Sequence, residues 1–196
     1  VMRFKKRLYE ANKEAARFFH KNLFDPEGQR AVSYIKKRAL LPEMVTKFGL
    51  GYAKNSWDEL CTHLKSLGFN QSEIVAAGLA RRRKNGGIYD IFRERLMFPI
   101  IDAKNNILGF GGRVLGNDNE GQKYINTGNT PIYSKKSNLF AYNLAKKSKT
   151  DKLILVEGYM DTVSLHQAGF DNTVASLGTA LTSEQAKLMG KIAKEV

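Results

Sequence analysis

The sequence contains very little cysteine and no long apolar run. Cys61 is the only cysteine in 196 residues, so neither an internal disulfide nor a zinc site built from several cysteines can form. This usage favours a reducing compartment, and we expect a cytoplasmic protein. No apolar stretch approaches the roughly 18 residues that a membrane-spanning helix needs, and the charged first residues do not resemble a signal peptide. We therefore expect no membrane partner.

Acidic residues are also scarce, and the scarcity is uneven. The chain has 32 lysines and arginines against 19 aspartates and glutamates, a net charge of +13. Residues 1–150 hold 28 basic and 13 acidic residues, whereas residues 151–196 hold four and six. This excess is uncommon in metabolic enzymes and indicates an anionic partner. The basic part would bind phosphates, and the acidic end would carry out different chemistry.

Hydrophobic periodicity changes at the basic segment 146–152. Apolar residues recur at helical spacing over residues 2–23. Two β-rich runs around the turn-forming AKNN predict a hairpin between residues 95 and 115. From residue 151 onward, strands and helices alternate, which is typical of parallel βαβ units. The predicted fold is α+β, with a basic domain of helices and a β-hairpin at 1–150 and the first βαβα part of a parallel sheet at 151–196.

Smaller features carry local predictions. Ser56 and Glu59 have the spacing of a capping box before a helix that ends at Gly68. The basic run at 81–84 beside Asn-Gly-Gly predicts a mobile loop, with contact to phosphate as the alternative. Residues 116–137 are predicted to be loop-rich. SNLFAYNLAKK predicts a further helix.

An acidic pair stands at the end of a predicted strand, in the segment LILVEGYMD. Ligands of open parallel sheets bind outside the carboxyl ends of the strands, where Glu157 is expected. Gly158 permits a sharp turn, and Asp161 follows in the first turn of the next helix. Carboxylates on adjacent elements suit a magnesium ion that bridges to substrate phosphates. The alternative is structural, since the helix dipole favours aspartate in a first turn and acids at strand ends are ordinary.

The glycine-rich segment GFGGR, which ends at Arg113, carries two interpretations. Its glycines would let a phosphate or base approach the backbone, or they would mark a bulge in the hairpin. The segment lacks the lysine and following Ser/Thr of a Walker loop, so no ATPase is implied. Tyr124 and Tyr133 could stack on unpaired bases or pack in the core.

Several segments together resemble the catalytic core of bacterial DnaG-type DNA primases. VEGYMD at 156–161 and VASLGT at 174–179 are similar to the first motif and second strand of the TOPRIM domain in that family. The upstream segments that agree in order are YIKKRAL (34–40), FGLGYA (48–53), FRERLMFPIID (92–102), GFGGRVLG (109–116), KYIN (123–126) and TPIYSKK (130–136). The resemblance covers nearly the whole chain.

The resemblance implies an enzyme that synthesises short RNA primers on single-stranded DNA from metal-bound nucleoside triphosphates. Glu157 and Asp161 would be the catalytic acids and ligands of Mg²⁺ or Mn²⁺. The positions that it assigns to the template strand are Arg38, Arg113 and Lys123. Those that it assigns to the nucleotide and template site are Arg93, Arg95, Asn126 and Lys135. Taken alone, Arg38 and Lys123 would be ordinary solvated charges.

The sequence departs from this family in one respect. TOPRIM enzymes of this kind carry a later Asp-x-Asp pair, which does not occur in these residues, so we expect a piece of a longer primase. The resemblance places zinc in a separate N-terminal module and assigns contact with the replicative helicase to another region. Two alternatives stay open, namely a noncatalytic module for single-stranded nucleic acid and another TOPRIM enzyme, a topoisomerase or nuclease.

Overall fold

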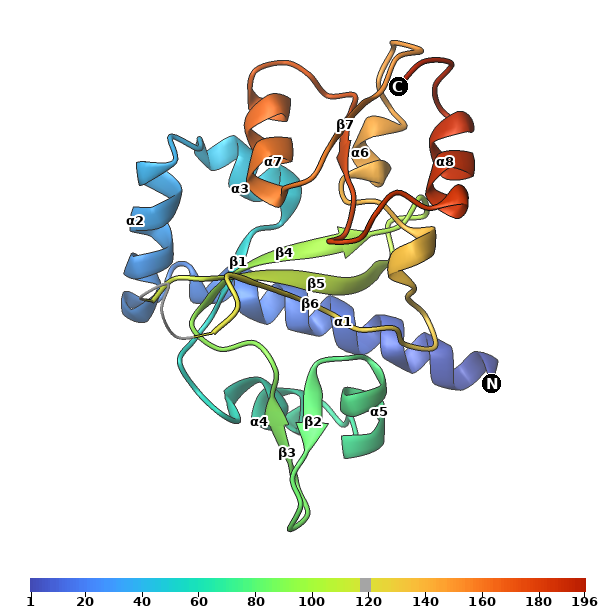
Figure 1. Cartoon of the computed structure of the whole chain (residues 1–196). Helices are drawn as coiled ribbons and strands as arrows, with labels where there is room; N and C mark the ends of the chain where they lie inside the picture. Colours follow the sequence, from blue (N-terminus) through green and yellow to red (C-terminus); the bar gives the residue numbers. More distant parts are fainter. Residues whose placement is uncertain (117–120) are drawn as a thin grey trace.

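The computed structural model describes residues 1–116 and 121–196 (Figure 1). The helices are α1 (Met2–Asn22), α2 (Gln29–Lys37), α3 (Pro42–Phe48), α4 (Glu59–Ser66), α5 (Gln71–Ala76), α6 (Tyr142–Ala145), α7 (Tyr159–Gln167) and α8 (Ser183–Gly190), with 3-10 turns η1 (Pro26–Gly28) and η2 (Lys135–Ser137). The strands are β1 (Gly51–Ala53), β2 (Ala80–Arg82), β3 (Ile88–Asp90), β4 (Arg95–Ile101), β5 (Ile107–Val114), β6 (Tyr124–Asn126), β7 (Ile154–Val156) and β8 (Thr173–Ala175).

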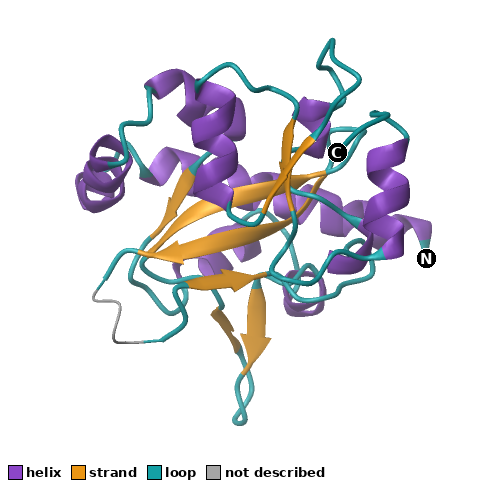
Figure 2. Ribbon diagram, turned by 45° about the horizontal axis from the view of Figure 1, so that its top comes forward, coloured by secondary structure: helices purple, strands orange, loops and turns teal. Residues whose placement is uncertain are grey.

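A central antiparallel sheet in the order β1-β4-β5-β6 organises the molecule (Figure 2). The pair β2–β3 forms a separate antiparallel hairpin that projects from the body (Figure 1). Strands β7 and β8 are parallel neighbours joined through α7, as a βαβ unit requires. The α+β fold, the 95–115 hairpin and the parallel end of the chain are therefore confirmed. None of the helices that the structure describes combines the length and apolar character needed to cross a bilayer.

The alternation of side chains along β4 builds a core on each face of the central sheet. Leu96 and Phe98 belong to the core that also contains Tyr159 of α7. Met97, one residue away, belongs to the core formed with Phe19 of α1. Successive strand residues point to opposite faces, so a fully apolar strand must be covered on both. In this way the βαβ unit packs on one face and the long amphipathic helix on the other (Figure 1).

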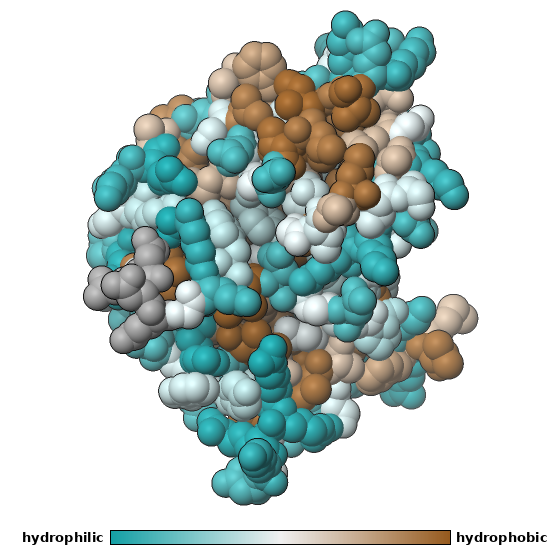
Figure 3. Space-filling model, in the orientation of Figure 1, coloured by the Kyte–Doolittle hydropathy of each residue, from teal (hydrophilic) through white to brown (hydrophobic). Residues whose placement is uncertain are grey.

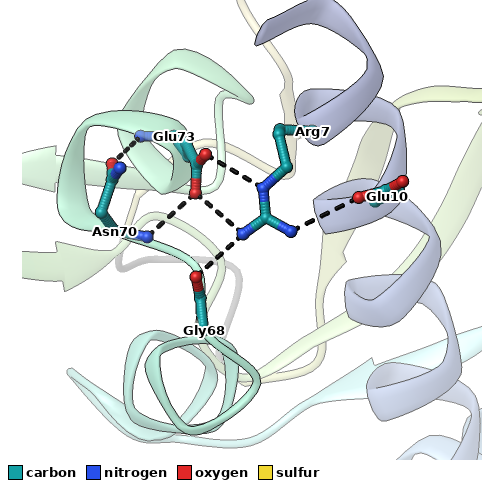
Figure 4. A network of polar contacts seen from close by, with 5 residues as sticks. All are labelled: Arg7, Glu10, Gly68, Asn70 and Glu73. Atoms are coloured by element: carbon teal, nitrogen blue, oxygen red, sulfur yellow. Dashed lines mark hydrogen bonds and ion pairs between the residues drawn. The ribbon is translucent and has the colours of Figure 1, made fainter. Parts of the chain in front are cut away.

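An ion pair joins α1 to the start of α5 (Figure 4). Arg7 donates from Nε and Nη2 to the two carboxylate oxygens of Glu73, at 3.0 and 3.1 Å, and from Nη2 to the Gly68 carbonyl. Glu73 also accepts from the Asn70 amide, while the Asn70 side chain accepts from the Glu73 amide. This capping box therefore also ties the helix to α1.

Replacing Glu73 by glutamine should lower the free energy of unfolding by about 1.5–3 kcal/mol near pH 7, because hydrogen bonds to a charged group are lost. The hydrogen bonds from Arg7 lower the pKa of Glu73 below its ordinary 4.5. The stabilisation is therefore present above the unfolded-state pKa and is lost as the pH falls through the folded-state value. Urea unfolding should show the gap between wild type and E73Q shrinking toward about pH 3. The same difference in unfolding free energy at about pH 7 and at about pH 3 would contradict this prediction. The control is E10Q, because Glu10 is a more exposed partner of Arg7 and its loss should change stability little.

Several local predictions need correction. One half of the Ser56–Glu59 box forms at the start of α4, since Ser56 Oγ accepts from the Glu59 amide at 3.1 Å, but the helix begins after Asp58. The Asp90 carboxylate accepts from the next two amides, of Leu60 and Cys61, at 2.9 Å each. The run predicted as a mobile loop forms part of the β2–β3 hairpin. Within 116–137, residues 117–120 lie outside the described residues, and the rest is loop-rich as predicted apart from β6 and η2. The helix expected in SNLFAYNLAKK is confined to the short α6. Two of these differences involve partners distant in sequence, which local pattern does not reveal: Asp90 binds the start of α4, and the Phe140 amide before α6 donates to the Ala175 carbonyl.

Candidate functional site

The acidic motif lies at the carboxyl end of β7. Glu157 follows the strand directly and is exposed, and Asp161 is exposed in the first turn of α7. The Asp161 carboxylate folds back over Gly158. A Cβ atom at position 158 would lie 2.9 Å from Asp161 Oδ2, which is closer than Cβ atoms normally approach another atom. Gly158 therefore leaves the space that the Asp161 carboxylate occupies, next to the backbone that follows Glu157.

These carboxylates suit a divalent cation in donor type, since Mg²⁺ and Mn²⁺ prefer hard oxygen ligands that leave room for water and phosphate. Within residues 1–116 and 121–196, no group of three His, Cys, Asp or Glu side chains could hold one metal ion. Glu157 and Asp161 therefore fit as part of a metal site, with the remaining ligands to come from elsewhere.

Tyr159, between the two acids, anchors the motif to the central sheet. Its ring stacks on Phe98 with centroids 5.0 Å apart and on Tyr124 at 5.7 Å. Its hydroxyl donates to Asn126 Oδ1 at 2.7 Å, and Asn126 Nδ2 reaches the Leu177 carbonyl at 3.4 Å. Burial raises the pKa of Tyr159 well above its ordinary value, so the hydroxyl remains a donor. Asn126 thus connects β6 to α7 through Tyr159 and to the segment after β8 through Leu177.

The glycines of GFGGR serve close packing within the protein. A Cβ at Gly111 would lie 2.3 Å from Cζ of Tyr159, and one at Gly109 would lie 2.8 Å from the Thr127 side chain. The register of β4 and β5 shifts between Ile100, which pairs with Gly109, and Ile101, which pairs with Ile107, so the irregularity borders the first glycine. The bulge interpretation is therefore confirmed beside Gly109. The glycines also make room for neighbouring side chains, because Thr127 lies over Gly109 and Tyr159 over Gly111.

A cationic and aromatic cluster extends from Tyr124 toward α2. The Arg113 guanidinium lies 4.5 Å from the ring centre of Tyr34 and 6.0 Å from that of Tyr124. Arg38 lies over the same Tyr34 ring at 5.7 Å and donates from Nε to its hydroxyl at 3.1 Å. Burial is the main cause that raises the pKa of Tyr124, whereas Arg113 and Arg38 act in the opposite direction. Two predicted template residues therefore share one aromatic platform.

Arg113 is held in this cluster with part of its hydrogen-bonding capacity unused. Its Nη1 donates to the Val114 carbonyl, and its buried Nε has no partner among the described residues. Lys123 is exposed immediately before Tyr124 on β6. The cluster of Tyr34, Arg38, Arg113 and Tyr124, here called the Tyr34 cluster, joins the acidic motif through the Tyr124–Tyr159 stack.

The remaining predicted residues lie in other surroundings. Arg95 is 6% exposed and donates to the carbonyls of Gly112 and Gln122 at 2.9 Å, and burial lowers its pKa. It therefore supports the segment that carries Lys123. Arg93 lies over the Trp57 ring at 3.8 Å. Lys135 starts η2, and its carbonyl accepts from Gln185 of α8.

The sequence analysis did not identify three aromatic residues that contact the predicted site residues. Tyr34 stands four residues before Arg38, a spacing that places both on one helix face and could have indicated the pair. Tyr159 lies inside the acidic motif, but nothing in the sequence indicates its bond to Asn126. Trp57 carried no signal at all. Of the two tyrosines weighed for base stacking, Tyr133 is a core residue, 3% exposed, and Tyr124 is half-buried.

Comparison with known proteins gives two family matches that together cover most of the chain. Residues 18–146 match the N-terminal domain of the DNA primase catalytic core, and residues 151–196 match the Toprim domain. A DNA primase of Clostridium acetobutylicum is 46% identical over 191 residues, which are 97% of this chain and 31% of that protein. The chain spans about a third of the length of the curated relatives that it matches.

Solved structures agree with the sequence relatives. The RNA polymerase domain of Mycobacterium tuberculosis primase DnaG is 37% identical with a TM-score of 0.90, over 95% of this chain and 61% of that one. A DnaG primase catalytic domain bound to single-stranded DNA is 36% identical with a TM-score of 0.90, over 100% of this chain and 63% of that one. The resemblance read from the motifs is confirmed: the chain belongs to the DnaG-type DNA primase family, with part of its catalytic core and of its Toprim domain.

Proposed function

We propose that this chain is the part of a DNA primase that binds single-stranded DNA template and supplies the first acidic motif for RNA primer synthesis. The observation that carries the proposal is the stack of Tyr159 on Tyr124, which joins the exposed acids to the Tyr34 cluster. A template strand on that cluster would run beside Glu157 and Asp161. Residues 1–150 would then be the template-binding domain and residues 151–196 the acidic one.

The chain's own residues would act by binding and positioning. Arg38, Arg113 and Lys123 would neutralise template phosphates, and Tyr34 and Tyr124 offer aromatic faces near an unpaired strand. Asn126 and Tyr159 would hold the acidic motif at a fixed distance from that strand. Arg93 and Lys135 would border the nucleotide path, and Arg95 would act through the carbonyls that it binds.

Glu157 and Asp161 would hold Mg²⁺ or Mn²⁺, which neutralises triphosphate charge when bound. The primer 3′-hydroxyl, releasing its proton to solvent, would attack the α-phosphorus of the incoming nucleoside triphosphate, forming a phosphodiester bond as the bond to the departing pyrophosphate breaks. Because no side chain serves as a covalent nucleophile in this scheme, the protein's contribution is orientation and electrostatics. The zinc module and the helicase contact remain proposals for other segments of a primase, and cytoplasmic location remains a proposal for the protein.

Reversing the charge of Arg113 tests the template surface. Arg113→Glu should weaken binding of oligo(dT) about tenfold or more and reduce the slope of log affinity against log salt by about 0.7 or more, since at least one phosphate contact is lost. Fluorescence anisotropy at several salt concentrations measures both quantities. Lys191→Glu, the same reversal at an exposed residue after α8, is the matched control. Equal slopes for wild type and R113E would remove Arg113 from the template site.

A further inference from the structure

Helix α2 ends in a turn with a backbone conformation that suits glycine, but Ala39 occupies it. The Leu40 amide donates to the Ile35 carbonyl at 3.1 Å. The Ala39 amide donates to the Lys36 carbonyl at 2.9 Å, and the two bonds together form a Schellman motif. Ala39 takes the left-handed position of that motif, with a φ of 56°. A side chain makes this conformation less favourable than it is for glycine, so contacts from outside the turn must help to hold it.

The side-chain amide of Gln167 supplies such a contact. Its Nε2 donates to the Ala39 carbonyl at 2.8 Å, and its Oε1 accepts from the Leu41 amide at 2.8 Å. One amide group therefore binds the backbone on both sides of Leu40, and the opposite orientation of the amide would satisfy neither group. Gln167 is the last residue of α7, which Figure 1 shows beside α3, with α2 on the far side of α3. Both bonds lie at the molecular surface, and Figure 3 shows hydrophilic side chains among apolar ones at the upper left, over these helices.

The last turn of α7 is a rigid support for Gln167. The neighbouring His166 is buried, and its Nε2 bonds to the Thr173 carbonyl at 2.8 Å. The His166 ring also lies edge-on to that of Phe48 in α3, with ring centres 5.0 Å apart. The turn that contains Ala39 is exposed, in contrast. The two amide bonds therefore hold the turn against the helix, and the helix itself is held by the core.

The same turn carries Arg38, one of the predicted template residues. Arg38 immediately precedes Ala39, and its guanidinium lies over the Tyr34 ring and donates from Nε to the Tyr34 hydroxyl at 3.1 Å. At the other end of α7, Asp161 stands in the first turn. A helix rises by about 1.5 Å per residue, so Asp161 and Gln167 are roughly 9 Å apart along its axis. Through Gln167, a single helix thus connects a predicted template residue with the acidic motif.

We propose that Gln167 is a positioning residue, which holds the turn after α2 in its left-handed conformation and so fixes Arg38 for the template strand relative to the acidic motif. The inference rests on the proposed function, because it explains how Arg38 would be placed in the template site. It requires that the turn depend on Gln167 while Ala39 occupies the left-handed position. With glycine at that position, the turn should form without the amide bonds.

Hydrogen exchange measured by NMR tests the turn in the absence of nucleic acid. Gln167→Ala should lower the protection of the Leu40 amide about tenfold, because its bond to Ile35 then opens more often. Adding Ala39→Gly to that variant should restore the protection to within about threefold of wild type. Unchanged protection in Q167A would overturn the proposal, and so would a loss that A39G does not restore.

Asn172→Ala is the matched control for the loss of an amide. The Asn172 side chain donates to the Lys152 carbonyl at 2.8 Å, so this variant also removes a bond from a side-chain amide to the backbone, but away from the turn. It should leave the protection of the Leu40 amide unchanged. A loss in N172A equal to that in Q167A would show a general effect on the acidic domain and would overturn the proposal.

A double-variant cycle tests the link to template binding. Arg38→Ala should weaken binding of oligo(dT) about fivefold and Gln167→Ala about threefold, because each removes or misplaces one phosphate contact. The double variant should bind within about twofold of R38A alone, since Gln167 acts through Arg38. Adding A39G to Q167A should return the affinity to within about twofold of wild type. Fluorescence anisotropy measures all these affinities, and losses that simply multiply in the double variant would overturn the link.

Primer synthesis by a longer primase chain distinguishes a misplaced Arg38 from a damaged acidic motif. Q167A should raise the KM for template about threefold and leave kcat within about twofold of wild type, because Tyr159 still anchors the start of α7. A lower kcat at unchanged KM would overturn the proposal, because Gln167 would then act on the acidic motif.

The Arg113→Glu variant separates this inference from the proposed function. An unchanged salt slope in R113E, with Gln167 and Arg38 still coupled, would remove Arg113 from the template site and support this inference. A reduced slope in R113E, with R38A binding like wild type, would support the proposed function and overturn this inference. Unchanged binding in both R113E and R38A would overturn both proposals.

Discussion

Glu157→Gln should reduce primer synthesis about 10³-fold or more in a longer primase chain that contains these residues, because it removes a charge that would hold the catalytic cation. Affinity for single-stranded DNA should be unchanged or slightly higher, since one negative charge near the strand is lost. Synthesis of labelled RNA on unprimed single-stranded DNA measures the first quantity, and anisotropy measures the second. Glu157 is exposed, so its substitution should leave the unfolding temperature within about 2 °C.

Glu43→Gln is the matched control for this experiment. Glu43 is an exposed acid in the first turn of α3, a position chemically similar to that of Asp161 but outside the candidate site. E43Q should keep full activity. Retained synthesis in E157Q would exclude Glu157 from the mechanism. Loss of synthesis together with loss of DNA binding would indicate a structural role instead. Template binding without synthesis in the wild-type longer chain would favour the noncatalytic binding module.

Gly111→Ala should destabilise the protein by about 1–3 kcal/mol, the usual cost of overpacking a core. The added methyl group would lie 2.3 Å from Cζ of Tyr159, a buried ring packed against Phe98 and Phe140 that has little room to move. Thermal unfolding followed by circular dichroism should show a midpoint lower by about 4–8 °C for a mid-range loss of about 2 kcal/mol. Displacing Tyr159 would also disturb its bond to Asn126, so primer synthesis should fall even where the protein remains folded.

Gly128→Ala is the control, because a Cβ at that position would meet nothing within 4 Å. It should change stability by less than about 0.5 kcal/mol. A double variant, Gly111→Ala with Tyr159→Leu, tests the cause: if the clash is with the ring, the two effects should be clearly less than additive. Additive losses would place the cost of G111A elsewhere.

The acids and the aromatic residues differ in how well the sequence predicted them. The positions of Glu157 after β7 and of Asp161 in the first turn of α7 were predicted because a strand, a glycine and a first helical turn are local patterns. Their role as catalytic acids stays a prediction. Trp57 and Tyr159 were not found, because their neighbours come from distant segments. Asp90 shows the same limit, since it accepts from an amide of α4 from 30 residues away, beside the local bond that Ser56 makes to Glu59.

The sequence alone determined the α+β class, the hairpin of β4 and β5, the parallel βαβ end and the basic charge that favours an anionic partner, because each depends on periodicity, turn residues or composition. Tertiary structure alone decided that the glycines of GFGGR accommodate Tyr159 and Thr127, that Arg95 is buried on carbonyl groups while Arg113 stacks on Tyr34, and that Arg81 and Arg82 lie on opposite faces of a hairpin. The physical reason is that burial and stacking depend on which distant surfaces meet, and no spacing along the chain encodes that directly.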